Sequence, residues 1–145
     1  MNRTPIQLFV PHFRIDESLD AVRTCMERGW TGLGFMTVDI EQKWKEYTGV
    51  KNAHFVNSNT AGLHLALDVL KRRRGWADGD EVITTALTFV STNHAILYCG
   101  LTPVFADVDE YLCIDPASLL ERITDKTRAV MFVGIGGNVG RYLEV

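Results

Sequence analysis

The chain has 145 residues, a net charge of −3 at pH 7, 46% hydrophobic residues and 23% charged residues. These values are typical of one modest globular domain, and the slight negative charge gives no electrostatic reason to expect a nucleic-acid partner. No apolar run reaches the length of a membrane span, and the N-terminus lacks a signal-peptide core. The three cysteines and four histidines have no metal-ligand spacing, so we expect reduced thiols, no metal site and a cytoplasmic protein.

The first 48 residues predict an extended arm followed by two helices. Residues 1–14 contain two prolines and no lasting periodicity, which favours the arm. Apolar residues then recur with helical spacing over residues 16–28 and 37–47, and a glycine follows each stretch. Residues 29–34 are too rich in glycine for a regular element and are either a plain connector or a functional loop.

From residue 49 onward, short β-prone runs alternate with helical patterns. Strands are predicted at residues 53–56, 81–85, 103–106 and 127–133. Helices are predicted after the turn at 57–62, over 89–98, and from Asp115–Pro116 onward with a buried face of Leu119, Leu120 and Ile123. This alternation predicts an α/β fold with a mostly parallel sheet flanked by helices. Sites in such sheets lie at the carboxyl ends of strands, where the turn after Val56 and the segment after Thr85 both fall.

The turn at residues 57–62 combines small polar side chains with the start of a helix. The first N–H groups of a helix have no internal partner, and the helix dipole favours negative charge there. Two interpretations follow from the residues alone. Either Ser58, Asn59 or Thr60 caps the helix, or the turn binds a phosphate group.

Several motifs follow one another in a fixed order along the chain. They are Asn57-Ser58-Asn59-Thr60-Ala61-Gly62-Leu63, Asp78-Gly79-Asp80-Glu81-Val82-Ile83, Thr88-Phe89-Val90-Ser91-Thr92-Asn93 and Pro103-Val104-Phe105-Ala106-Asp107. In this order the chain, from about Gly29 to its end, resembles the DegT/DnrJ/EryC1/StrS family of pyridoxal-phosphate (PLP) sugar aminotransferases. The resemblance implies the aspartate aminotransferase-like large domain of fold type I. Residues 1–48 would form the arm and helices, and residues 49–145 an incomplete N-terminal part of the PLP-binding domain.

The resemblance also assigns residues to the cofactor. Thr60, through its hydroxyl and N–H, and Ala61, through its N–H, would contact the phosphate of PLP. Asn59 stands where the family usually has glycine, and asparagine tolerates left-handed backbone better than most residues. Phe89 would stack on the pyridine ring, while the alternative for Phe89 is packing in the core.

Substrate and partners follow from the same resemblance. Residues 29–34, including Thr31 and Gly32, would form a loop near the substrate, with the cofactor site at the interface of a homodimer. The substrates would be a nucleotide-linked keto-sugar and an amino-acid donor. The family often has Pro-Val-His where this chain has Phe132-Val133-Gly134, so substrate contacts from a histidine are not expected there.

No catalytic residue is expected in this portion, because the lysines lie on polar helix faces or in loops: Lys43, Lys45, Lys51, Lys71 and Lys126. Asp107 and Asp109 are expected to be structural residues at a strand end. The chain is therefore interpreted as the N-terminal portion of a PLP-dependent aminotransferase that moves an amino group from glutamate to a nucleotide-linked keto-sugar, in cell-surface polysaccharide biosynthesis. Two alternatives stay open: a PLP-dependent sugar dehydratase of the same family, with histidine in place of the lysine, and a truncated, non-catalytic interaction module.

Overall fold

A computed structural model describes residues 10–29 and 32–145. The chain forms two compact units, Met1–Phe55 and Val56–Val145, which are considered separately. The domain division predicted between residues 48 and 49 stays a prediction. Among the described residues, no helix is long and apolar enough to cross a membrane.

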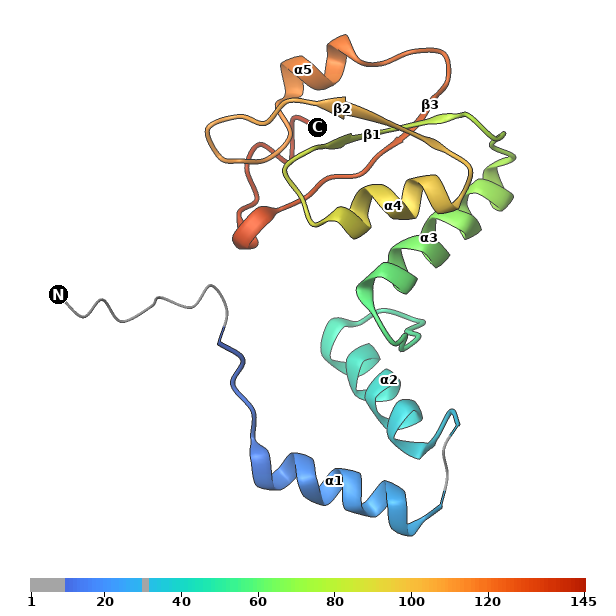
Figure 1. The fold of residues 1–145 in the computed structure, drawn as a ribbon, viewed down its shortest axis with the longest axis vertical. Coiled ribbons are helices and arrows are strands. Elements are labelled where there is room, and N and C mark those ends of the chain that lie inside the picture. The colour runs from blue at the N-terminus through green and yellow to red at the C-terminus, as the bar shows by residue number, and fades with distance from the viewer. Residues whose placement is uncertain (1–9, 30–31) are drawn as a thin grey trace, which may run out of the picture. The chain divides into compact units, whose positions relative to one another are not determined.

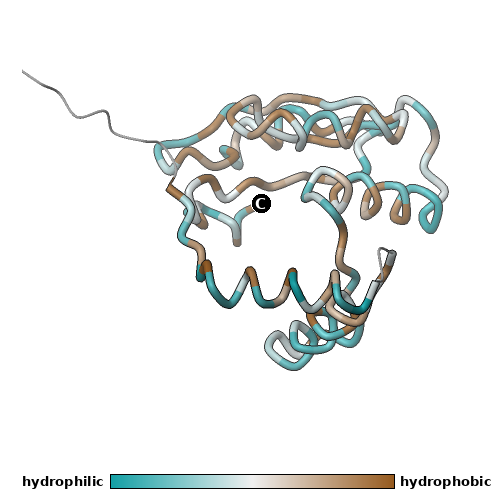
Figure 2. Tube along the Cα trace, turned by 60° about the horizontal axis from the view of Figure 1, so that its bottom comes forward, coloured by the Kyte–Doolittle hydropathy of each residue, from teal (hydrophilic) through white to brown (hydrophobic). Residues whose placement is uncertain are grey.

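The first unit contains helices α1 (Ile15–Glu27) and α2 (Phe35–Thr48), shown in Figure 1. Both predicted helices are confirmed, with ends that differ by one or two residues. Helix α2 ends because Gly49 adopts φ +77°, a left-handed conformation that glycine enters without strain. The apolar residues Leu19, Val22 and Met26 of α1 are exposed. Brown and teal segments alternate along the helices in Figure 2, as expected for amphipathic helices.

The second unit is a three-layer α/β fold. Its elements are α3 (Asn59–Arg74), β1 (Glu81–Thr85), α4 (Val90–Tyr98), β2 (Thr102–Ala106), α5 (Pro116–Glu121), β3 (Thr127–Val130) and the 3-10 turn η1 (Ile135–Gly137). The sheet has the order β2-β1-β3, and β1 pairs in parallel with both neighbours. Helices α3 and α4 cover one face and α5 covers the other (Figure 1). The predicted parallel sheet flanked by helices is confirmed.

The core lies on both faces of β1. Val82 and Ile83 are fully buried but point to opposite faces, as successive residues of a strand do. Val82 packs with residues of α3 and α4, among them Leu67, Ala95 and Ile96. Ile83 packs on the other face in a cluster with Ala106, Ile114 and Leu119.

Three expectations about local structure are wrong. Residues 53–56 are not a strand, because this segment pairs with none of the strands β1, β2 and β3; the N–H of Phe55 donates instead to Glu41 Oε1 at 2.8 Å. The third strand ends at Val130 rather than Val133. Leu120 and Ile123 are exposed, because the short helix α5 ends at Glu121 and buries Leu119, together with Pro116 and Ser118, on its inner side.

An ion pair joins the start of β1 to β3. Asp80 Oδ2 accepts hydrogen bonds from Arg128 Nε and from the backbone N–H of Ala77, both at 2.9 Å. The Arg128 hydrogen bond, followed by the one from Ala77, lowers the pKa of the Asp80 carboxyl below its ordinary value. The folded state therefore favours the ionised carboxylate.

We expect Asp80→Asn to lower the thermal unfolding midpoint at pH 7, and the loss to shrink in acid. Because the folded pKa of Asp80 lies below the unfolded value of about 3.9, its stabilising effect is complete above that value and disappears as the pH falls through the folded pKa. Midpoints measured from pH 7 to pH 3 test this. Asp125→Asn is the control, since Asp125 is exposed and its side chain has no hydrogen bond among the described residues. A difference between Asp80→Asn and the parent that stays constant with pH would contradict the linkage.

Candidate functional site

The turn before α3 is organised by Ser58. Ser58 has extended backbone, and its Oγ accepts a hydrogen bond from the N–H of Ala61 at 3.2 Å. The carbonyl of Ser58 also accepts the N–H of Gly62 at 3.1 Å. Ser58 is therefore the N-cap of α3, and the capping interpretation is confirmed for this residue. It also follows that the Ala61 N–H already has an acceptor.

The hydrogen-bond donors of Thr60 are not used by this N-cap. Neither its N–H nor its hydroxyl makes a hydrogen bond within the part of the chain that the structure describes. Asn59 is the first helical residue and has no left-handed backbone, so the turn does not need the glycine usual in the family. Two unpaired donors of Thr60 at the positive end of a 16-residue helix can receive an anion. Capping by Ser58 and anion binding at Thr60 are therefore compatible.

Phe89 lies immediately before α4 and is 77% exposed. Phe89 is therefore not packed in the core formed by the described residues. The ring offers a free aromatic face at the carboxyl end of β1, and its predicted stacking on a pyridine ring stays a prediction.

A polar network beneath Phe89 was not anticipated from the sequence. Thr84 Oγ1 donates to Asn93 Oδ1 at 3.2 Å, and Asn93 Nδ2 donates to the carbonyl of Thr85 at 3.4 Å. The hydroxyls of Thr88 and Thr92 lie 2.9 Å apart and share a hydrogen bond. Thr84, Thr85 and Thr92 are buried, so these bonds fix the segment between β1 and α4 from inside. The signal in the sequence was the concentration of threonine on both sides of residues 86–87.

The two predicted substrate residues, Thr31 and Gly32, do not belong to the unit that contains the predicted cofactor residues. Thr31 lies outside the described residues. Gly32 is exposed and belongs to the first compact unit, whereas Thr60 and Phe89 belong to the second. The guanidinium of Arg28 lies 3.8 Å from the ring centroid of Phe35, a cation–π contact between the residues on either side of the 29–34 segment.

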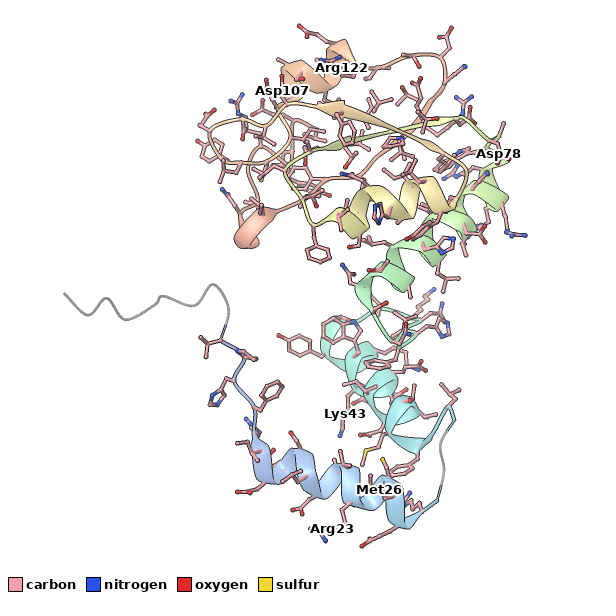
Figure 3. All side chains as sticks on the ribbon, in the orientation of Figure 1. Arg23, Met26, Lys43, Asp78, Asp107 and Arg122 are labelled. Carbon is pink, nitrogen blue, oxygen red and sulfur yellow. The ribbon has the colours of Figure 1, made fainter. Side chains whose placement is uncertain are left out.

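Two of the lysines and both aspartates that were set aside have structural contacts. Lys43 pairs with Asp39 at 2.7 Å, and Lys71 contacts Asp78 and the carbonyl of Cys99. The N–H of Asp107 donates to Ser118 Oγ at 3.0 Å, at the end of β2 (Figure 3).

Asp109 has a nearly buried side chain that organises the following turn. Its Oδ1 accepts the N–H of Tyr111 at 2.9 Å, and Arg141 Nε lies 3.3 Å from its Oδ2 in an ion pair. No donor within the described residues is aligned for a hydrogen bond to Oδ2, so this oxygen depends on the charge of Arg141.

The packing of the segment after β3 explains why residue 134 is glycine rather than the histidine that is frequent in the family. A Cβ placed on Gly134 would lie 2.6 Å from the carbonyl oxygen of Asn138, which is closer than real Cβ contacts. Asn138 is itself held, since its Nδ2 donates to the carbonyl of Tyr111 at 2.7 Å. A histidine could therefore replace Gly134 only if Asn138 moved.

A family model decides the affiliation. The model of the DegT/DnrJ/EryC1/StrS aminotransferase family matches residues 14–144. The chain belongs to this family. Over 122 residues and 83% of its length, it is 43% identical to the spore coat polysaccharide biosynthesis protein SpsC of Bacillus subtilis and 38% identical to GDP-perosamine synthase of Caulobacter vibrioides. It spans about a third of each, 30% and 32% of their lengths.

Solved structures of this family have the same fold. Spr1654 of Streptococcus pneumoniae in its PLP form matches with a TM-score of 0.81 and 31% identity, over 92% of this chain and 33% of that one. Helicobacter pylori PseC, an aminotransferase of pseudoaminic acid biosynthesis, matches with a TM-score of 0.77 and 29% identity, over 89% and 34%. An E. coli GDP-4-keto-6-deoxy-D-mannose-3-dehydratase with bound hydrated PLP matches with a TM-score of 0.80 and 27% identity, over 89% and 34%. These neighbours confirm the predicted fold class and indicate PLP as the cofactor.

We expect Asn93→Ala to destabilise the protein, because it leaves the buried Thr84 hydroxyl and the Thr85 carbonyl without their partner. The loss of unfolding free energy should be about 1–3 kcal/mol, measured by urea unfolding. Asn52→Ala is the matched control, since Asn52 is exposed and has no side-chain hydrogen bond among the described residues. It should change the free energy by less than about 0.5 kcal/mol. Equal effects of the two changes would show that the network does not hold this segment.

Proposed function

We propose that the chain is the N-terminal portion of a PLP-dependent aminotransferase that transfers an amino group, with glutamate as donor, to a nucleotide-linked keto-sugar. The observation that carries the proposal is the pair of unpaired donors on Thr60 at the start of α3, in a chain of this family. The sugar-nucleotide part is supported by the name of GDP-perosamine synthase and by a dehydratase structure with bound GDP-perosamine.

The residues of this portion fit the cofactor in two respects. Thr60 supplies a hydroxyl and an N–H for the phosphate, and Ser58 holds the helix start so that both donors stay in place. The exposed ring of Phe89 supplies one wall for the pyridine ring, and Thr88 and Thr92 fix the segment that carries it. When bound, PLP supplies the electron-withdrawing ring on which amino transfer depends. Ala61 would contribute its N–H only by sharing it with Ser58.

The substrate side of the proposal rests on the family alone. Thr31 and Gly32 would contact the sugar substrate, and a second copy of the protein would complete the site in a homodimer. Sedimentation of the full-length protein tests the dimer.

A dehydratase is a second candidate, because structures of GDP-4-keto-6-deoxymannose-3-dehydratase match this chain with a TM-score of 0.80. Borohydride reduction of the full-length holoenzyme, followed by mass spectrometry of its peptides, separates the two. A lysine carrying the reduced cofactor supports the aminotransferase, and its absence from every peptide supports the dehydratase.

We expect Thr60→Val in the full-length enzyme to weaken PLP binding roughly 10- to 150-fold, because a hydrogen bond to a charged group is lost while the side-chain shape is kept. The loss should appear in the dissociation constant more than in turnover at saturating PLP. Fluorescence titration of the apo-enzyme measures it. Thr37→Val removes a hydroxyl from the first turn of α2 and serves as the control. If Thr60→Val binds PLP as tightly as the parent, Thr60 does not hold the phosphate.

We expect Phe89→Ala to weaken PLP binding and to shift the visible absorption band of the bound cofactor, because the ring loses a stacking partner. Phe89→Tyr should keep both properties near those of the parent. Since Phe89 is 77% exposed, the alanine variant should unfold with nearly unchanged free energy. An unchanged spectrum in Phe89→Ala would remove Phe89 from the cofactor site.

A further inference from the structure

Two adjoining hollows lie at the end of α3, and their walls come from both α3 and β3. The larger, of about 370 Å³, is lined by Leu70, Arg74, Trp76, Arg128 and Ala129. The smaller, of about 310 Å³, is lined by Leu70, Arg73 and Arg74. Because Leu70 and Arg74 belong to both, the two form one depression, which we call the arginine hollow.

The arginine hollow is remote from the candidate cofactor residues. Thr60 and Arg74 lie at opposite ends of α3, roughly 20 Å apart at 1.5 Å of rise per residue. The N–H of Glu81 at the start of β1 donates to the carbonyl of Lys126, just before β3, at 2.9 Å, so the hollow lies where these two strands begin (Figure 1). Phe89 follows the other end of β1. A ligand in the arginine hollow would therefore not touch the cofactor.

The unused polar groups on the side chains of this hollow are all hydrogen-bond donors. The guanidinium groups of Arg73 and Arg74 make no hydrogen bond or ion pair to any residue that the structure describes. Arg128 uses Nε for Asp80 and Nη1 for backbone carbonyls, which leaves its Nη2 unused within the described chain. The indole N–H of Trp76 likewise has no acceptor there. A hollow whose free side-chain groups donate, and carry positive charge, selects an anion.

Part of this charge serves the helix itself, because cations stabilise the carboxyl end of a helix. Residues 71–74, the last turn of α3, are all basic. The helix dipole does not explain why Arg128 is brought to the same place from β3. Two neighbouring carboxylates are already neutralised, since Asp68 pairs with Arg72 at 2.8 Å and Asp80 pairs with Arg128 at 2.9 Å. The hollow therefore keeps positive charge beyond what the helix needs.

We propose that the arginine hollow binds a small organic phosphate, with the phosphate on Arg74 and Arg128 and an aromatic or apolar part on Trp76 and Leu70. Arginine guanidinium groups match the geometry of phosphate oxygens, and an indole offers an aromatic face. A phosphate monoester carries up to two negative charges at neutral pH, enough to engage two guanidinium groups. The volume lies at the lower end of small-molecule pockets, roughly 300–1,000 Å³, so the ligand is small. This inference does not depend on the proposed function.

The test is isothermal titration calorimetry of the full-length holoenzyme with phenyl phosphate, which combines a phosphate with an aromatic ring. In the holoenzyme the cofactor site is already filled. We expect Arg74→Gln to weaken binding of phenyl phosphate roughly 10-fold, because a charge-assisted hydrogen bond is lost. The variant should unfold at the same temperature as the parent, since the side chain of Arg74 is exposed and unpaired among the described residues.

Arg122→Gln is the matched control. Arg122, labelled in Figure 3, is exposed, lies at the C-cap of α5 on the other face of the sheet, and has no side-chain hydrogen bond within the described residues. The change removes the same charge and should alter the affinity less than about twofold. An equal loss in Arg122→Gln and Arg74→Gln would mean that only the net charge matters and would overturn the proposal, as would unchanged affinity in Arg74→Gln.

Two comparisons separate the parts of the ligand. Methyl phosphate, which lacks the ring, should bind at least about 3-fold more weakly than phenyl phosphate, and phenol, which lacks the charge, should bind more weakly still. Equal affinity for the two phosphates would show that Trp76 takes no part and would overturn the site as described. PLP affinity, measured in parallel, should be unchanged in Arg74→Gln. A matching loss of PLP affinity would place the probe in the cofactor site instead.

Discussion

The burial of β1 on both faces is the constraint on which the second compact unit depends. Val82 and Ile83 have no exposed surface, and each anchors a different cluster. A strand buried on both faces must find its backbone partners within the sheet, and β1 finds them in β2 and β3. Helices α3 and α4 pack against each other and on the face of β1 that carries Val82, and α5 packs on the face that carries Ile83. Strand β1 therefore lies between the two helical layers and contributes to both clusters.

The same strand determines where chemistry is possible. The last two residues of β1, Thr84 and Thr85, are polar, and both are still buried. Buried hydroxyls need partners, and Asn93 provides one from the first turns of α4. This requirement fixes where α4 begins and leaves Phe89 outside it, exposed, immediately before the helix. The exposed aromatic is thus a consequence of satisfying polar groups behind it.

The sequence was sufficient for the elements whose signals are local. Asp115 and Pro116 place the start of α5, and the alternation of short strands and helices indicates the parallel sheet. It was insufficient where a partner distant in sequence decides. Among the described residues, the segment 53–56 has strand propensity but no paired strand, and Leu120 has helical spacing but is not covered by another element. Propensity describes one segment, whereas pairing and burial depend on two.

For the candidate site, the sequence predicted which types of residue occur in the turn before α3, but not which of them caps the helix. Ser58, Asn59 and Thr60 were each able to cap α3, and only the backbone geometry assigns the cap to Ser58. That assignment matters because Ser58 uses the N–H of Ala61 and not the donors of Thr60.

At Gly134, after the end of β3, a contact with a residue four positions later likewise decides what the sequence alone could not predict. In the family a histidine often stands there, but here the carbonyl of Asn138 occupies the space that a Cβ needs. Asn138 is fixed to the turn after Asp109 through the carbonyl of Tyr111, and Gly140 packs on Cys113 so closely that a Cβ would lie 2.6 Å from the cysteine Cβ. The loss of the histidine is therefore coupled to a tighter local packing of the C-terminal segment. Because Gly134 has no side chain, it makes no polar side-chain contact at this strand end, whereas Thr60 in the same unit has two donors without a partner among the described residues.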